Sequence, residues 1–183
     1  MGLRERRENR RRERRQFGAG GEAPQYMLRQ KLLSIGGDSW IEDATGERVL
    51  KVDGKALRLR RTLDLEDTHG ERLCRIQTRV LHLRDTMVIE GPDGATKATV
   101  HKALITPLRE RWKVDVTDGT DLEVQGNVLD HEYAIEADGQ KIAEVSKKWF
   151  RLRDTYGVQV SPGADTVLVL AVAVALDVMT DSG

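Results

Sequence analysis

Residues 167–176 read VLVLAVAVAL, an unbroken run of ten apolar side chains that decides the fold. Asp165 or Thr166 can cap a helix at the start of this run, and Asp177 ends it. Valine favours strand whereas alanine and leucine favour helix, but the segment is long for one strand and normal for a helix. The sequence therefore predicts a helix over about residues 165–179. A helix that is apolar on every face must be buried.

The apolar run is short for a membrane span. At 1.5 Å per residue a helix of this length covers about 15–20 Å, against a hydrocarbon core of about 30 Å. A helix in the core of the domain is the preferred interpretation, and a membrane tail is the alternative. Burying ten such side chains contributes on the order of 15 kcal/mol before entropy is counted, so the rest of the fold would depend on this helix.

Between Tyr26 and about Pro162 the apolar residues recur at every second position. Side chains of a strand alternate between two faces, so this spacing predicts strands with one buried face. The clearest runs are Leu57, Leu59, Leu63 and Leu65; Trp112, Val114 and Val116; and Tyr133, Ile135 and Ala137.

Six short sequences typical of tight turns separate these runs. Glycine allows the positive φ that hairpin turns require, and aspartate tolerates it. Many short antiparallel strands follow, roughly ten to twelve at typical strand lengths, which indicates a barrel or a sandwich. The turn sequences are Thr45-Gly46, Asp53-Gly54, His69-Gly70, Asp93-Gly94, Asp118-Gly119 and Asp138-Gly139.

The sequence Leu-Arg-Asp-Thr occurs twice, at residues 83–86 and 152–155. Each copy follows a predicted basic strand, over residues 75–82 and 144–151, and precedes an apolar one. The repetition suggests a sheet built from two related halves. The aspartate of each copy is expected to shape a corner by accepting backbone N–H bonds. Arg84 and Arg153 either lock that corner through ion pairs or grip a phosphate.

Charge divides the 183 residues into two regions. Residues 1–15 hold eight arginines and three glutamates, a net charge of +5, so the rest of this formally neutral chain carries −5. We interpret residues 1–25 as a flexible arm and glycine linker, and residues 26–183 as one domain. Nucleic acid is expected to bind only through the arm, if at all, because the body is acidic.

Little in the sequence indicates catalysis. The four histidines lack metal-ligand spacing, and no phosphate-binding loop or nucleophile elbow occurs, so we expect no metal, no cofactor and no enzyme activity. The only cysteine, Cys74, is expected to be a buried hydrophobic residue. It rules out an intrachain disulfide, which fits a reducing compartment. We expect a cytoplasmic monomer without a signal peptide, and leave peripheral membrane attachment open.

The densest basic cluster of the domain lies just before the second repeat. Strand alternation would place Lys147, Arg151 and Arg153 on one face together with Trp149, and Lys148 on the other. A basic strip beside an aromatic ring suits a phosphoinositide headgroup or single-stranded nucleic acid. A solvated sheet face is the simpler alternative. The candidate anion-binding residues are Lys147, Lys148, Trp149, Arg151, Arg153 and Arg84.

The stretch SKKWFRLRDTYGV at residues 146–158 resembles the LURP-one-related family, which belongs with the tubby C-terminal domains and the phospholipid scramblases. YMLRQK at residues 26–31 and RVLHLRDT at residues 79–86 are also similar to the family's pattern. The resemblance covers about residues 26–179. It implies a closed antiparallel tubby-like barrel of twelve strands around a central hydrophobic C-terminal helix. It also implies no established catalytic residues.

Three functional hypotheses follow. The leading one is a non-enzymatic tubby-like module that binds an anionic ligand, such as a phospholipid headgroup, or a protein partner. The second is a membrane-attached, scramblase-like protein whose C-terminal helix enters lipid. The third is a small enzyme with an unrecognised site, which a cleft containing titratable groups in contact would favour.

Overall fold

The computed structural model describes residues 23–29, 38–54, 62–78, 86–103, 111–149 and 154–181. Within these ranges the chain forms twelve strands, a short 3₁₀ helix η1 (Lys147–Trp149) and an α-helix α3 (Thr166–Asp181). The strands are β1 (Gln25–Arg29), β2 (Ser39–Asp43), β3 (Arg48–Asp53), β4 (Thr62–Glu66), β5 (Arg72–Thr78), β6 (Thr86–Glu90), β7 (Thr96–Lys102), β8 (Arg111–Val116), β9 (Leu122–Asn127), β10 (Glu132–Ala137), β11 (Gln140–Ser146) and β12 (Thr155–Val160).

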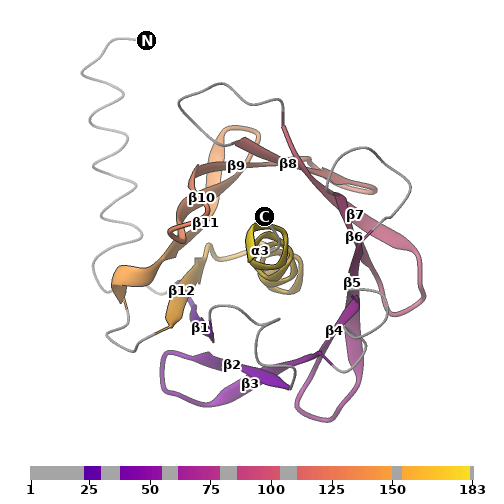
Figure 1. Cartoon of the computed structure of the whole chain (residues 1–183), viewed down its shortest axis with the longest axis vertical. Helices are drawn as coiled ribbons and strands as arrows, with labels where there is room; N and C mark the ends of the chain where they lie inside the picture. Colours follow the sequence, from indigo (N-terminus) through magenta and orange to yellow (C-terminus); the bar gives the residue numbers. More distant parts are fainter. Residues whose placement is uncertain are drawn as a thin grey trace.

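The twelve strands form one closed antiparallel barrel (Figure 1). Each strand pairs with its neighbours in the sequence, and β1 closes the sheet by pairing with both β2 and β12. Closure leaves no sheet edge exposed, so the backbone ladder is satisfied all the way round. The predicted barrel of about twelve strands is confirmed.

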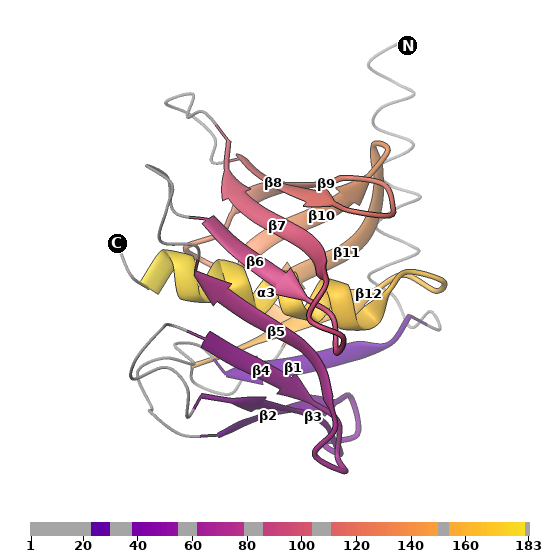
Figure 2. The ribbon, with the colours of Figure 1, turned by 90° about the vertical axis from the view of Figure 1, so that its right-hand side faces the viewer.

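Helix α3 runs through the middle of the barrel (Figures 1 and 2). The carboxylate of Asp165 caps its start by accepting the Leu168 N–H at 3.0 Å. Residues 169–179 are all buried. The predicted core helix is therefore confirmed, with its end at Asp181 rather than about residue 179. It packs most closely against β5, β6, β7 and β12.

The predicted alternation of side chains is confirmed on the strands where it was clearest. In β8, Trp112 and Val114 are buried whereas Arg111, Lys113 and Asp115 are exposed. Tyr133 and Ile135 of β10, and Leu63 and Leu65 of β4, also face the core. Leu57 and Leu59 lie outside the described residues.

Three hairpins share one turn geometry at one end of the barrel, which we call the turn end. In each, the first residue accepts a hydrogen bond from a glycine N–H three positions later: Gly46, Gly70 and Gly94. These glycines have φ of 80–86° and lie 24 residues apart. The strands β2–β7 therefore form three hairpins that repeat every 24 residues, a repeat that sequence reasoning missed. The repeated turn sequences are Asp43–Glu47, Asp67–Glu71 and Gly91–Ala95.

One of the six predicted turns is wrong. Asp53 is the last residue of β3 and pairs with Asp64 of β4, so residues 54–61 connect the two strands and Asp53-Gly54 is no tight turn. The predicted basic strand over residues 75–82 is confirmed for residues 75–78, which belong to β5, whereas residues 79–82 lie outside the described ranges. The other five turn sequences do connect consecutive strands.

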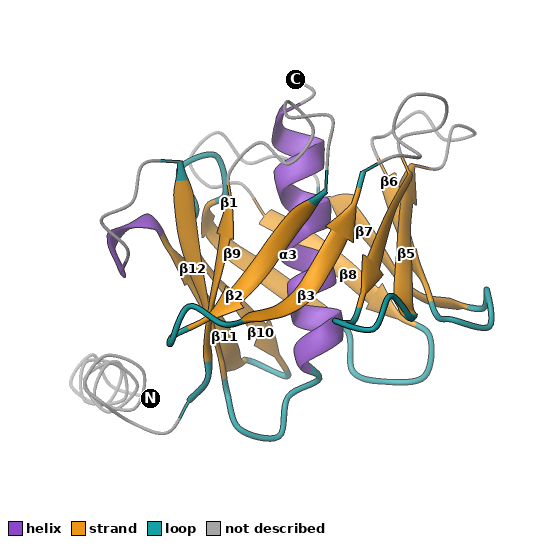
Figure 3. Ribbon diagram, turned by 90° about the horizontal axis from the view of Figure 1, so that it is seen from below, coloured by secondary structure: helices purple, strands orange, loops and turns teal. Residues whose placement is uncertain are grey.

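The opposite end of the barrel is where α3 ends, and we call it the helix-exit end (Figure 3). Because the strands run alternately up and down, every second connection lies there. The β9–β10 turn at residues 128–131 consists wholly of described residues. Between β11 and β12 the structure describes η1 and Asp154, whereas residues 150–153 lie outside the described ranges. Both connections carry candidate functional residues.

Candidate functional site

The basic segment Lys147–Trp149 forms η1 at the helix-exit end rather than the strand that was predicted. The carboxylate of Glu132, on β10, bends the chain there. It accepts hydrogen bonds from the Ser146 hydroxyl at 3.0 Å and the Lys147 backbone N–H at 3.2 Å. The Ser146 hydroxyl in turn accepts the Lys148 N–H at 3.1 Å. The predicted division of this segment between two strand faces is therefore wrong.

Within η1 the lysines and the tryptophan differ in exposure. The Lys148 side chain is 80% exposed and its ammonium lies 3.2 Å from the Glu132 carboxylate. Lys147 and Trp149 are half-buried, and η1 packs along β12. Three of the six candidate residues thus lie on one short, anchored turn. The other three, Arg84, Arg151 and Arg153, lie outside the described residues.

The β9–β10 turn lies beside η1. Its tip is Leu129, whose exposed fraction is 59%, whereas the preceding Val128 is 2% exposed. The turn is held by the Asn127 and Asp130 side chains, which bond each other at 2.6 Å, and by the Asp130 N–H donating to Asn127 Oδ1 at 3.0 Å. Leu129 therefore points outward from a fixed turn.

A buried polar cluster lies beneath this turn. His131 Nε2 lies 2.8 Å from Asp177 Oδ1 of α3, and both residues are less than 10% exposed. The His131 ring packs on Tyr156 of β12 with ring centroids 4.3 Å apart. His131 has φ of 51°, a left-handed conformation that histidine tolerates better than most residues.

The tyrosines of this cluster are held neutral. Burial is the main cause that raises the pKa of Tyr133 and Tyr156, and the nearby Asp177 carboxyl adds to it. Neither the Tyr156 hydroxyl nor His131 Nδ1 has a hydrogen-bond partner among the described residues. Sequence reasoning missed the cluster. The available signal was Asp177 itself, a carboxylate within a helix that has no polar face.

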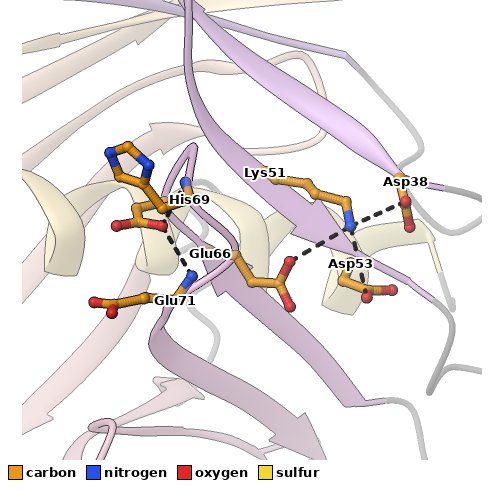
Figure 4. Close-up of polar contacts among 7 residues, drawn as sticks. Asp38, Lys51, Asp53, Glu66, His69 and Glu71 are labelled. Atoms are coloured by element: carbon orange, nitrogen blue, oxygen red, sulfur yellow. Dashed lines mark hydrogen bonds and ion pairs between the residues drawn. The ribbon is translucent and has the colours of Figure 1, made fainter.

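An ion cluster lies on the outer face of β2–β4 (Figure 4). The Lys51 ammonium lies 3.0 Å from Asp38, 3.4 Å from Glu66 and 3.8 Å from Asp53. The hydrogen bond to Asp38 is the main cause that raises the pKa of Lys51. The four residues come from three neighbouring segments, so the cluster fixes how these segments are aligned. Because Lys51 is paired with all three carboxylates, we assign the cluster a structural role.

A shallow acidic groove of about 440 Å³ lies over β8–β10 near the turn end. Asp121, which lines this groove, accepts the Val116 N–H at 2.9 Å and so shapes the β8–β9 turn. In the part of the chain that the structure describes, no three His, Cys, Asp or Glu residues are arranged to hold a metal ion. The charged lining residues are Lys113, Asp115, Asp121, Glu123, Glu136 and Asp138.

Cys74 is 4% exposed and belongs to the core, as predicted. Burial raises the pKa of its thiol to about 12. The thiolate is the reactive form of cysteine, so this residue is not a nucleophile at neutral pH.

A closed twelve-stranded antiparallel barrel threaded by its own C-terminal helix defines a tubby-like protein. The sequence pattern of the LURP-one-related family matches residues 25–177. The chain therefore belongs to the LURP-one-related family, as the resemblance predicted.

Among solved structures, the chain is similar to a protein of Arabidopsis thaliana determined by X-ray crystallography. The TM-score is 0.64 at 18% identity, over 85% of this chain and 90% of that one. This similarity establishes the fold alone. No curated protein matches the sequence. Within the described ranges, no helix is both long and apolar enough to cross a bilayer.

Proposed function

We propose that this protein is a non-enzymatic tubby-like module that binds anionic phospholipid headgroups through the segment Lys147–Trp149. The observation that carries the proposal is the exposed Lys148 beside Trp149, on a turn that Glu132 holds in place. An anchored turn loses little conformational entropy when a ligand binds. Arg84 and Arg153, from the two copies of the Leu-Arg-Asp-Thr sequence, and Arg151, just before the second copy, remain proposed contributors.

The electrostatics of the segment suit a membrane surface. A lysine near an anionic leaflet contributes about 1 kcal/mol, and tryptophan prefers the interface between lipid and water. Because exposed charges are screened by salt, binding should weaken as ionic strength rises. We accordingly propose a cytoplasmic protein that associates peripherally with the membrane. Binding to a protein partner is the competing proposal.

A scramblase-like role is disfavoured by the packing of α3. The helix would have to leave the barrel to enter lipid, and residues 169–179 are buried there. Exposing this core would cost on the order of 15 kcal/mol, which matches or exceeds the usual stability of a domain.

An enzymatic role has one feature in its favour, the contact between His131 and Asp177. Both groups lie beneath the barrel wall, with 9% and 4% of their side chains exposed, rather than in a cleft that a substrate can enter. Catalytic acids and bases must reach the proton that they transfer. The pair therefore supports a structural role better than a catalytic one.

Vesicle flotation tests the lipid proposal. At low salt the protein should float with vesicles containing phosphatidylserine and a phosphoinositide, and not with neutral phosphatidylcholine vesicles. The double variant Lys147→Gln/Lys148→Gln should lose most of this binding. Its matched control, Lys97→Gln/Lys113→Gln, removes the same charge from exposed positions on β7 and β8 and should bind normally.

Equal flotation with neutral and anionic vesicles would reject the proposal, as would equal loss in both double variants. A third variant, Arg84→Gln/Arg151→Gln/Arg153→Gln, tests the remaining candidate residues. We expect it to weaken anionic-vesicle binding further, because Arg84 and Arg153 belong to the two copies of the repeat and Arg151 directly precedes the second copy.

A further inference from the structure

We infer that the helix-exit end of the barrel docks on an anionic bilayer with the Leu129 side chain inserted among the lipids. This inference rests on the proposed function and adds to it the orientation of the protein and the apolar contact. Leu129 is the one large hydrophobic side chain that is exposed among the described residues. A single exposed leucine is unremarkable by itself, so its position carries the argument.

Leu129 occupies the tip of the turn adjacent to η1. The register places Glu132 opposite Asn127 on one side and opposite Ser146 on the other. The β9–β10 turn and η1 therefore leave the barrel at the same level from neighbouring strands. Glu132 joins them physically, because its carboxylate holds the Lys147 N–H and the Lys148 ammonium. The turn that carries Leu129 therefore lies next to η1, which carries Lys147, Lys148 and Trp149.

The turn is built to keep Leu129 outside. Its two ends are fixed by the Asn127–Asp130 side-chain pair and by the His131 N–H donating to Val128 O at 3.0 Å. His131 is itself held by Asp177 at the end of α3. Val128 already fills the space below the turn, with 2% exposure. A leucine at a fixed tip can bury its side chain only in something that approaches from outside.

The combination fits a bilayer better than a free headgroup. Lysines attract the phosphates, while leucine and tryptophan gain free energy by entering the interface. A soluble inositol phosphate can use the lysines but has nothing to offer Leu129. Loss of one leucine insertion should reduce vesicle partitioning roughly tenfold, given the transfer free energy of a leucine side chain.

The neighbouring Asp130 opposes this docking. It is exposed, and its carboxylate would approach the lipid phosphates together with Leu129. Asp130→Asn should therefore strengthen binding to anionic vesicles. No change, or a loss of binding, would count against docking in this orientation.

The central test compares Leu129→Gln with wild type on anionic vesicles and on soluble inositol hexakisphosphate. We expect about a tenfold loss on vesicles, no change on the soluble ligand, and unaltered thermal unfolding because the side chain is exposed. Lys147→Gln/Lys148→Gln should weaken both kinds of binding. The matched control Thr120→Leu, at the turn end, should not restore vesicle binding when added to Leu129→Gln.

A spectroscopic test detects insertion directly. Leu129→Cys can be labelled with an environment-sensitive fluorophore, because the native Cys74 is buried. Anionic vesicles should shift its emission to the blue, whereas a label on Thr120→Cys should not respond. Wild-type vesicle binding by Leu129→Gln, with no emission shift at position 129, would overturn the inference while leaving headgroup binding intact. Wild-type protein that binds no anionic vesicle overturns the proposed function as well.

Discussion

His131 Nε2 and Asp177 Oδ1, 46 residues apart in the chain, lie 2.8 Å apart inside the barrel. The contact joins the β9–β10 turn to the end of α3. Hydrophobic packing has no direction, and α3 is apolar on every face along residues 167–176. A directional contact near its end therefore fixes how far the helix is threaded and how it is rotated. A single buried polar pair can specify register in this way.

Removing one partner of this pair should be costly. Asp177→Ala leaves the His131 ring buried without its partner, so we expect the free energy of unfolding to fall by about 3–5 kcal/mol. Urea denaturation measures the change. Asp181→Ala, at an exposed position of the same helix, is the control and should change stability by less than about 0.5 kcal/mol. Similar stability of the two variants would show that the pair does not hold the helix.

The centre of α3 should not accept a charge. Val172 is 0% exposed, and an unpaired carboxylate there costs several kcal/mol against a total stability of about 5–15 kcal/mol. Val172→Asp should therefore give no folded protein. Val172→Ala removes only methyl groups and should remain folded with a lower melting temperature. Thermal unfolding by circular dichroism distinguishes them, and a normal transition in Val172→Asp would contradict the core-helix assignment.

Gly126, which lies within β9 and pairs with Tyr133 of β10, should be the least replaceable of the described glycines with positive φ. It has φ of 137°, and a Cβ there would lie 2.5 Å from Glu132 O and 2.7 Å from Tyr133 Cα. Both contacts are with backbone that cannot move aside, so Gly126→Ala should cost roughly 3 kcal/mol or more. Gly139 also has positive φ but has open space around it, so Gly139→Ala should cost about 1 kcal/mol. Chemical denaturation should rank them in this order; the reverse order would refute the steric argument.

The contribution of the Lys51 cluster to the free energy of unfolding should be lost at alkaline pH. The folded state raises the pKa of Lys51 above its ordinary value of 10.5. Its contribution is therefore fully present below pH 10.5 and is lost as the pH rises through the folded pKa. Lys51→Met should lower the free energy of unfolding by about 1 kcal/mol at pH 8, since the pairs are only partly buried.

The measurement is the urea midpoint of wild type and Lys51→Met between pH 8 and pH 11.5. The difference between them should shrink toward the alkaline end, as wild-type Lys51 loses its proton. Lys97→Met serves as the control, since Lys97 forms no ion pair with any described residue, and its midpoint should follow wild type throughout. A difference that stays constant with pH would mean that Lys51 acts through packing and not through charge.

The elements that the sequence predicts correctly depend on local patterns. The period of two in β8 and β10 and the apolar run of α3 follow directly from which side chains must avoid water. The turns at Gly46, Gly70 and Gly94 follow from the positive φ that glycine permits. Asp53-Gly54 was misjudged because the same dipeptide also fits the end of a strand, and only the pairing of Asp53 with Asp64 separates the two.

The sequence by itself thus determined a β domain that encloses one apolar helix, because hydrophobic burial is set by periodicity along the chain. The basic segment at Lys147–Trp149 could be identified from the sequence, but its conformation could not be predicted. Only the tertiary structure decided that Glu132 bends this segment into a 3₁₀ turn beside Leu129, and that Asp177 meets His131. Such contacts join residues from 15 to 46 positions apart. They depend on strand register and on the threading of the helix, which periodicity alone does not fix.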